Sequence, residues 1–323
     1  MNRREFATLA MLAAIVQSSD AHAESRIFKV ALLTLDSSET ADQLKGPLAQ
    51  LGYVEGKNLA FIHRTADNDA ARLGAIAEEL VRERPDVMVA GFGTLVPKAL
   101  MAATHDIPIV FSTVGDPVGA GLVQSLSYPG GNVTGFSGQS TEFKGKQLGL
   151  LLDCLPGQSV VGVLLNPDTP YTGLALKQLE VAADKRGVKL VLLQVRRPTE
   201  FTAREMDLLA VRGATSLFII EDPLISVIRS DVIEQARRLR LPTITGLSEY
   251  ARDGGLMSYG VDRTDLYRRT AGYVDRILKG AKPGDLPVEQ PTKFRLILNL
   301  KTAKAFNLTL PPSILVAAEE VIE

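Results

Sequence analysis

Small polar and acidic residues recur where short apolar runs of this sequence end. Their hydroxyls and amides donate and accept hydrogen bonds, a helix N-terminus offers N–H groups to a carboxylate, and an aspartate accepts an ammonium group. Such groups bind a small molecule without transforming it. Taken singly, each residue is explained as a cap of its own helix, and only convergence in one cleft favours a binding site. We expect that site to contain Asp36, Ser37, Gly93, Thr94, Thr113, Asp116, Asn166, Tyr171, Asp222 and Tyr259.

Catalytic and cofactor motifs are incomplete. Gly91-Phe92-Gly93-Thr94 follows a predicted strand and opens a helix, but the third glycine of a dinucleotide fingerprint falls on Val96. Gly145-Lys146-Gln147 lacks the Ser or Thr of a phosphate-binding loop, and residues 135–138 are one residue short of a nucleophile elbow. The three histidines are dispersed, and no Cys pair or H-E-x-x-H supplies metal ligands. We expect no catalytic residue, no metal and no cofactor.

Cys154 is the only cysteine, so no intramolecular disulfide can form. It lies in the apolar stretch 150–155, which favours a buried helical position over a thiol nucleophile. Stability must therefore come from packing.

The composition is that of an ordinary globular protein. Hydrophobic residues make up 46% and charged residues 23% of the 323 residues, and 36 basic against 37 acidic side chains give a formal charge of -1. The chain should fold, and no excess of positive charge favours nucleic-acid binding. The length predicts two domains.

From residue 28 onward, short apolar runs alternate with amphipathic stretches, which is typical of an α/β protein with largely parallel sheets. The predicted strands are Phe28–Thr34, Asn58–His63, Asp86–Ala90, Ile107–Phe111, Val160–Leu165, Lys189–Val195, Ser216–Ile220 and Leu241–Ile244. The predicted helices include Asp69–Arg84, with Asp69 as N-cap, and Gly173–Arg186, Glu200–Val211 and Ser226–Arg240.

The second half repeats the first. Three predicted strands recur at offsets of 131, 130 and 134 residues: those beginning near Val30 and Val161, Asp86 and Ser216, and Ile107 and Leu241. General α/β periodicity can produce similar spacing, but a near-constant offset over three strands favours two lobes of one topology.

Ligands of open α/β sheets bind outside the carboxyl ends of the strands, so two such lobes should share one cleft. The walls expected from the first lobe are residues 34–38, 91–94 and 113–116. Those expected from the second are residues 166–171, 221–223 and 246–250, with residues 259–260 near the crossing segments.

The first 23 residues have the pattern of a signal peptide. Arg3 and Arg4 precede an apolar run over residues 6–16, and Ala21-His22-Ala23 offers the small residues of a cleavage site. We expect cleavage after Ala23 and export to the periplasm by the general or the twin-arginine route. The alternative is a frayed N-terminal helix. No cysteine follows the run, so a lipid anchor is not expected.

Several segments resemble the tryptophan/tyrosine-type ABC transporter substrate-binding proteins. The similarity is carried by residues 115–123 (GDPVGAGLV), 129–135 (PGGNVTG), 51–59 (LGYVEGKNL), 165–167 (LNP), 286–294 (LPVEQPTKF) and 299–303 (NLKTA). Together these segments span nearly the whole chain after the signal peptide.

This resemblance implies a periplasmic-binding-protein type I fold, with two Rossmann-like lobes joined by three crossing segments near residues 137, 260 and 288. The lobes would comprise residues 24–137 with 261–287, and residues 138–260 with 288–323, so that the helix Asp265–Lys279 returns to the first lobe. The implied partners are a small-molecule ligand, such as an amino acid or similar carboxylate, and an ABC permease. We expect a monomer.

The family's ligand-facing loops correspond by position to Gly93-Thr94, Thr113, Asp116 and Asn166. We expect Thr94 to donate to a ligand carboxylate and Asp116 to accept an ammonium group, whereas a competing interpretation makes Asp116 a turn-former before Pro117. Two positions depart from the family. Phe92 stands where members commonly carry a small residue, and residues 63–67 replace an acidic, Trp-containing segment.

The leading hypothesis is a periplasmic receptor of an ABC importer without catalytic activity. The alternatives are a two-lobed exported enzyme, such as a glycosyltransferase, and a ligand-sensing module on the same fold.

Overall fold

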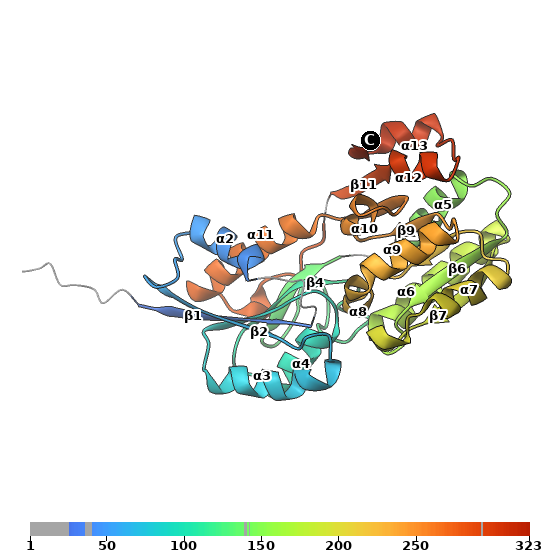
Figure 1. Cartoon of the computed structure of the whole chain (residues 1–323). Helices are drawn as coiled ribbons and strands as arrows, with labels where there is room; N and C mark the ends of the chain where they lie inside the picture. The colour runs from blue at the N-terminus through green and yellow to red at the C-terminus, as the bar shows by residue number, and fades with distance from the viewer. Residues whose placement is uncertain (1–25, 36–40, 139–140, 142, 292) are drawn as a thin grey trace, which may run out of the picture.

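The computed structural model describes residues 26–35, 41–138, 141, 143–291 and 293–323, which form two α/β lobes side by side (Figure 1). In both lobes, strands rich in Val, Ile and Leu alternate with helices, so the predicted fold class is confirmed. No helix in the described part of the chain is long and apolar enough to cross a membrane.

Lobe 1 is built on a five-stranded sheet. Its strands are β1 (Phe28–Thr34), β2 (Leu59–Thr65), β3 (Val87–Ala90), β4 (Ile109–Val114) and β5 (Val133–Ser137). Its helices are α2 (Asp42–Gln50), α3 (Leu73–Arg82), α4 (Leu95–Ala103) and α11 (Arg263–Leu278), with 3-10 turns η1 (Ala70–Arg72) and η3 (Pro283–Asp285). The strand order is β2-β1-β3-β4-β5, and every neighbouring pair is parallel.

Helices cover both faces of this sheet because successive side chains of a strand point to opposite sides. Val30 and Leu32 of β1 pack in the cluster that contains residues of α2 and α11, whereas Ala31 and Leu33 pack in the cluster that contains residues of α3 and α4. Helix α11 follows lobe 2 in the sequence and yet contacts α2 and β4 in lobe 1, as the resemblance implied.

Lobe 2 is built on a seven-stranded sheet. Its strands are β6 (Val160–Leu165), β7 (Lys189–Gln194), β8 (Leu217–Ile219), β9 (Thr243–Thr245), β10 (Met257–Val261), β11 (Phe294–Asn299) and β12 (Glu320–Ile322). Its helices are α5 (Lys144–Asp153), α6 (Pro170–Arg186), α7 (Ala203–Val211), α8 (Pro223–Val227), α9 (Arg229–Arg238), α10 (Ser248–Arg252), α12 (Leu300–Ala305) and α13 (Pro312–Ala317), with the 3-10 turn η2 (Pro198–Glu200). The order is β12-β11-β10-β9-β8-β6-β7, and only the β10–β11 pair is antiparallel.

The two sheets share one topology. Strands β6 to β10 occur in the same spatial order as β1 to β5, and lobe 2 adds β11 and β12 beyond that repeat. The repeat predicted from the three strand offsets is therefore confirmed. The chain passes between the lobes three times: from β5 to α5, from β10 to α11, and from Glu289, which bridges to Phe136, into β11.

Prolines shift the starts of two predicted strands. The sequence placed strand starts at Ile107 and Leu241, but β4 begins at Ile109 and β9 at Thr243. In each case a proline, Pro108 or Pro242, precedes the strand, because proline has no N–H to donate to the ladder.

The predicted helix Ser226–Arg240 was wrong as a single element. Asp222 caps α8 through a hydrogen bond to the Leu224 N–H, so this helix begins earlier than predicted. Ile228 then leaves helical geometry, and α9 starts at Arg229. The Ile228 side chain is buried in the core of lobe 2.

Gly135 in β5 provides a test of how tightly the last strand of lobe 1 is packed. Its φ is +155°, and a Cβ atom there would lie 2.2 Å from the Phe111 carbonyl oxygen. We expect Gly135→Ala to lower the free energy of unfolding by about 2–4 kcal/mol, because backbone rather than a side-chain tip must move.

Gly173→Ala is the matched control, since Gly173 lies in α6 with no atom within 4 Å of an added Cβ. This change should stabilise the protein by about 0.5–1 kcal/mol. Urea unfolding of both variants measures the difference, and equal stabilities would contradict the packing described for β5.

Candidate functional site

The carboxyl ends of the two sheets meet at a cleft that the lobes nearly fill. A first cavity, of about 10 Å³, is lined by Phe92, Gly93, Thr94 and Gly115 from lobe 1 and by Thr169, Tyr171, Glu221, Asp222 and Pro223 from lobe 2. A second cavity, of about 30 Å³, lies nearer the crossing segments, and its lining includes Phe92, Thr113, Gln147, Glu221, Tyr259 and Arg263. The two lobes thus share one buried site, as the strand topology predicted.

Two glycines of lobe 1 allow this close approach. A Cβ atom on Gly115 would lie 2.2 Å from Cε2 of Tyr171 in lobe 2. One on Gly93 would lie 2.9 Å from Cγ of Pro223, and the φ of Gly93 is +99°, in the region that favours glycine. The lobes are therefore in contact at these positions, and a side chain on either glycine would hold them apart.

A buried ion pair forms the lobe 2 wall. The Lys144 ammonium at the start of α5 donates to Glu221, which follows β8, and both side chains are almost fully buried. Gln147 Nε2 and the Tyr171 hydroxyl donate to the same carboxylate at 3.1 and 2.9 Å. Gln147 Oε1 in turn accepts from Lys144 Nζ at 2.9 Å. Glu221 thus accepts hydrogen bonds from three side chains.

Burial and pairing shift the pKa values of this pair. Burial would by itself raise the pKa of Glu221, but the Lys144 charge and the hydrogen bonds to the carboxylate lower the pKa overall. Burial lowers the pKa of Lys144, and attraction to Glu221 opposes that change. A charged pair of this kind needs every polar atom satisfied, which the contacts with Gln147 and Tyr171 help to provide.

Asp222 carries a second buried carboxyl group. It accepts from Asn166 Nδ2 at 3.1 Å, from the Thr169 hydroxyl at 2.5 Å and from the Leu224 N–H at 2.9 Å. Burial raises its pKa, while the hydrogen bonds oppose that shift. In the part of the chain that the structure describes, no cation forms an ion pair with Asp222.

Thr94 supplies a buried hydroxyl on the lobe 1 side. It is the N-cap residue of α4, and its Oγ1 makes no hydrogen bond within the described residues. The Gly93 N–H donates to the Thr113 carbonyl at 3.1 Å, which ties the end of β3 to the end of β4. A buried hydroxyl beside the first N–H groups of a helix is suited to receive an anionic group.

The structure brings most of the predicted site residues to this cleft. Gly93, Thr94, Tyr171 and Asp222 line the first cavity, and Thr113 and Tyr259 line the second. Asn166 reaches the site through its bond to Asp222.

Three of the predicted site residues are not among those that line the two cavities. Asp116 is absent from both linings, and its Oδ1 accepts the Gly119 N–H at 2.8 Å, which is the turn-forming arrangement. Asp36 and Ser37 lie outside the described residues. Their roles in binding stay predictions.

Sequence reasoning missed Lys144 and Gln147 and did not select Glu221, although it placed Glu221 in the expected wall. A lysine near a helix start is usually exposed, so its residue type gave no sign of burial. The spacing of Lys144 and Gln147, one helical turn apart, was the signal present, because it puts both on one helix face.

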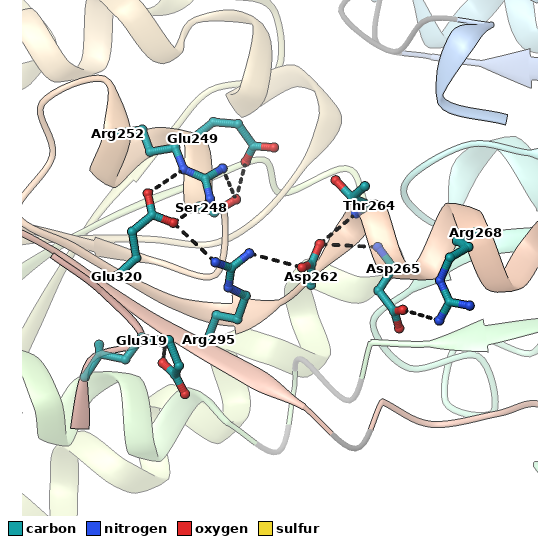
Figure 2. A network of polar contacts seen from close by, with 11 residues as sticks. Ser248, Glu249, Arg252, Asp262, Thr264, Asp265, Arg268, Arg295, Glu319 and Glu320 are labelled. Carbon is teal, nitrogen blue, oxygen red and sulfur yellow. Dashed lines mark hydrogen bonds and ion pairs between the residues drawn. The ribbon is translucent and has the colours of Figure 1, made fainter. Parts of the chain in front are cut away.

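Charged side chains bind the crossing strands to each other (Figure 2). Arg295 on β11 donates to Asp262, which caps α11, at 3.1 Å and to Glu320 on β12 at 3.4 Å. Arg252 on α10 donates to the same Glu320 oxygen at 2.8 Å. This chain of contacts connects the start of α11 in lobe 1 with β11, β12 and α10 in lobe 2.

A groove of about 760 Å³ lies beside this network, lined by Asp262, Asp265, Arg268, Arg269 and Arg295 among others. It is larger than the interlobe cavities, but it lies along the crossing segments and not at the strand ends. Five of the charged side chains that line it take part in ion pairs: Arg268 with Asp265, Arg269 with Glu289, and Arg295 with Asp262. The interlobe cavities are therefore the stronger candidate site.

No cluster of three His, Cys, Asp or Glu residues within the described ranges could hold a metal ion. Cys154 is buried at the end of α5, as predicted, and burial raises the pKa of its thiol to about 11. The thiol is therefore protonated at neutral pH.

Removal of one partner tests the buried ion pair. Lys144→Met leaves the Glu221 charge buried without its cation, so we expect a loss of about 3–5 kcal/mol in the free energy of unfolding. Adding Glu221→Gln removes that charge and should recover most of the loss. Lys45→Met, which breaks a partly exposed pair with Glu55, serves as control and should cost about 1 kcal/mol or less. Full additivity of Lys144→Met and Glu221→Gln would contradict the pairing.

Asp222 predicts a pH dependence of stability. Because its pKa is raised in the folded state, its contribution to stability is complete below about pH 4 and decreases as pH rises through the folded value. Asp222→Asn removes this titration, so the variant should gain stability relative to the wild type as pH increases. Urea unfolding at several pH values measures the difference, and a difference that does not vary with pH would contradict the assignment.

Comparison with known proteins places the chain in a family. Residues 33–322 match the family described as ABC transporter substrate binding protein. A tyrosine-binding protein of Clostridioides difficile (strain R20291) is 29% identical over 261 residues, which are 81% of this chain and 74% of that protein.

Two solved structures allow the arrangement of the lobes to be compared. The ABC domain of Streptococcus pneumonia in complex with L-Trp is 25% identical and has a TM-score of 0.83, with 92% of this chain and 100% of that chain covered. The ligand-free, open structure of a Clostridium difficile substrate binding protein with adhesive properties is 26% identical and has a TM-score of 0.65, over 92% and 99% of the chains. At similar identity, the lobes are thus arranged more like those of the tryptophan complex, in agreement with the contacts at Gly93 and Gly115. The chain belongs to the ABC transporter substrate-binding protein family, with the type I periplasmic-binding-protein fold.

Proposed function

We propose that this protein captures an amino acid, or a similar small carboxylate, between its lobes and delivers it to the permease of an ABC importer. The observation that carries this proposal is the shared cavity, because its walls come from strand ends of both lobes. A ligand held by both walls loses contact with water only when they meet, and its higher affinity for the closed form shifts the population toward closure.

Opposite ends of the cavity suit the two charges of an amino acid. We assign the carboxylate to Thr94 and the first N–H groups of α4, where a buried hydroxyl and a helix N-terminus lie together. We assign the ammonium group to Asp222 on the opposite wall. Asp116 was the expected partner of that group, but it lines neither interlobe cavity, whereas Asp222 lines the first one.

The known ligands of relatives support an amino acid. One structural relative holds L-Trp, and a sequence relative is a tyrosine-binding protein. We propose that the protein catalyses no reaction, since its family consists of substrate-binding proteins. This favours the receptor hypothesis over a two-lobed enzyme.

Export completes the proposed role. Residues 1–25 lie outside the described residues, so the signal peptide and the cleavage after Ala23 stay predictions. We propose that the mature protein works as a monomer in the periplasm. The units that close would be residues 24–137 with 261–287 and residues 138–260 with 288–323, as expected from the sequence.

A side chain at Gly115 tests closure directly. We expect Gly115→Ala to push against the Tyr171 ring and hold the lobes apart, because its Cβ would overlap Tyr171 in the closed form. Apparent affinity falls with the population of the closed form, so amino-acid binding should weaken about tenfold or more. Calorimetric titration with each of the common L-amino acids and small-angle scattering measure both effects.

Gly272→Ala in α11 is the control, because an added Cβ there has no neighbour within 4 Å. The wild type and this control should show a smaller radius of gyration with the amino acid that binds, whereas Gly115→Ala should not. If no amino acid binds the wild type, the proposed ligand class is wrong. If Gly115→Ala binds and compacts like the wild type, closure at this contact is wrong.

A further inference from the structure

A cavity of about 220 Å³ lies beside the interlobe site, where the chain passes from β10 into α11. Its lining shares Gly246, Gly260, Val261 and Arg263 with the second interlobe cavity, so the two spaces adjoin. An apolar cavity of about 150 Å³ holds benzene, so the space here is sufficient for a small organic molecule.

Elements of both lobes form the walls of this cavity, and their charged side chains are drawn in Figure 2. Helix α10 of lobe 2 provides Glu249 and Arg252, and β11 provides Arg295. The start of α11, which packs on lobe 1, provides Asp262. The lining therefore presents acidic and basic groups close together.

The Glu249 carboxylate is an acceptor without a cation. Its Oε2 accepts from the Ser248 hydroxyl at 3.4 Å, and among the described residues it takes part in no ion pair. The side chain is half-buried. Partial burial raises the cost of a charge that has no counter-charge, so this carboxylate favours an ammonium group.

Arg252 and Arg295 supply N–H donors at fixed positions. Arg252 donates to the two oxygens of Glu320 at 3.0 and 2.8 Å, and Arg295 donates to Asp262 at 3.1 Å and to Glu320 at 3.4 Å. A guanidinium has more N–H groups than these bonds use. The N–H groups that remain suit a carboxylate, which accepts charge-assisted hydrogen bonds from arginine.

Ser258 adds a buried hydroxyl without a partner. It lies on β10, lines the cavity and is 1% exposed, and its Oγ makes no hydrogen bond within the described residues. Buried hydroxyls are normally hydrogen-bonded, because an unpaired one costs free energy. A polar ligand in the cavity would supply the missing hydrogen bond.

We propose that this cavity is a second site, separate from the cleft between Thr94 and Asp222, and that it binds a small zwitterion such as a free amino acid. The ammonium group contacts Glu249, and the carboxylate contacts Arg252 and Arg295. A simple anion would meet two acidic side chains, and a simple cation would meet the arginines, so a ligand with both charges fits the lining best. This site goes beyond the proposed function, because neither lobe closure nor a permease is needed to fill it.

Equilibrium dialysis against radiolabelled L-serine tests the second site. All variants carry Asp222→Asn, which removes the ammonium partner proposed for the cleft. This parent should bind one L-serine per chain. Adding Glu249→Gln should weaken the binding at least about tenfold, because the ammonium group loses a charged partner. Adding Ser258→Ala should weaken it about threefold or more, and this variant serves if Glu249→Gln does not fold.

Glu319→Gln is the matched control. It makes the same change of charge beside the same network, but Glu319 lines the groove of about 760 Å³ and not this cavity. Its affinity for L-serine should stay within about twofold of the parent. L-lactate lacks the ammonium group and ethanolamine lacks the carboxylate, so each should displace L-serine at least about tenfold more weakly than unlabelled L-serine does.

The outcomes separate this site from the proposed function. If L-serine does not bind the parent, if Glu249→Gln binds it within twofold, or if Glu319→Gln loses as much, the second site is overturned while the cleft stands. If L-lactate or ethanolamine competes as well as L-serine, the zwitterion assignment is overturned. If L-serine binds as expected but no amino acid compacts the wild type, the second site stands and the proposed function fails.

Discussion

The site depends on how closely the two lobes can approach each other. At Gly93 and Gly115 the lobe 1 backbone meets Pro223 and Tyr171 of lobe 2 with no side chain between them. This contact requires matching strand ends on both sides, which the repeated 2-1-3-4-5 strand order supplies. It also encloses polar groups of both lobes in one buried space. The proposal that the lobes bind a ligand by closing rests on this geometry.

The charged and polar side chains of the two walls determine which ligand groups the site can bind. Glu221 is neutralised within lobe 2 by Lys144, whereas Asp222 is held by hydrogen bonds alone in the part of the chain described. In a site with little water, a carboxylate that lacks an ion-pair partner, such as Asp222, favours a cationic group on the ligand. The Thr94 hydroxyl on the other wall, which has no hydrogen bond within the described residues, favours an anionic group. The arrangement is suited to hold a zwitterion between the two walls.

Local sequence patterns were sufficient to predict the fold. Most of the features that these patterns missed depend on contacts between residues far apart in the sequence. Strands β1 and β6 match their predicted bounds because each is a short segment composed mostly of apolar residues, and α11 was placed in lobe 1 by resemblance. The burial of Lys144 depends on Glu221, which lies 77 residues away, and Phe92 of lobe 1 is buried in a cluster whose other members belong to lobe 2. By contrast, the bond from Gly119 to Asp116 spans three residues, and the competing turn interpretation had anticipated it.

We infer that one small ligand contacts both lobes in the interlobe cleft. Hydrogen–deuterium exchange of the mature protein, with and without the amino acid that binds most tightly, measures this claim without altering the chain. We expect slower exchange at residues 91–96 of lobe 1 and at residues 169–173 and 221–225 of lobe 2 in the same sample, with little change in α3 and α9 on the outer faces. Protection confined to one lobe, or centred on the groove beside Asp262 and Arg295, would contradict it.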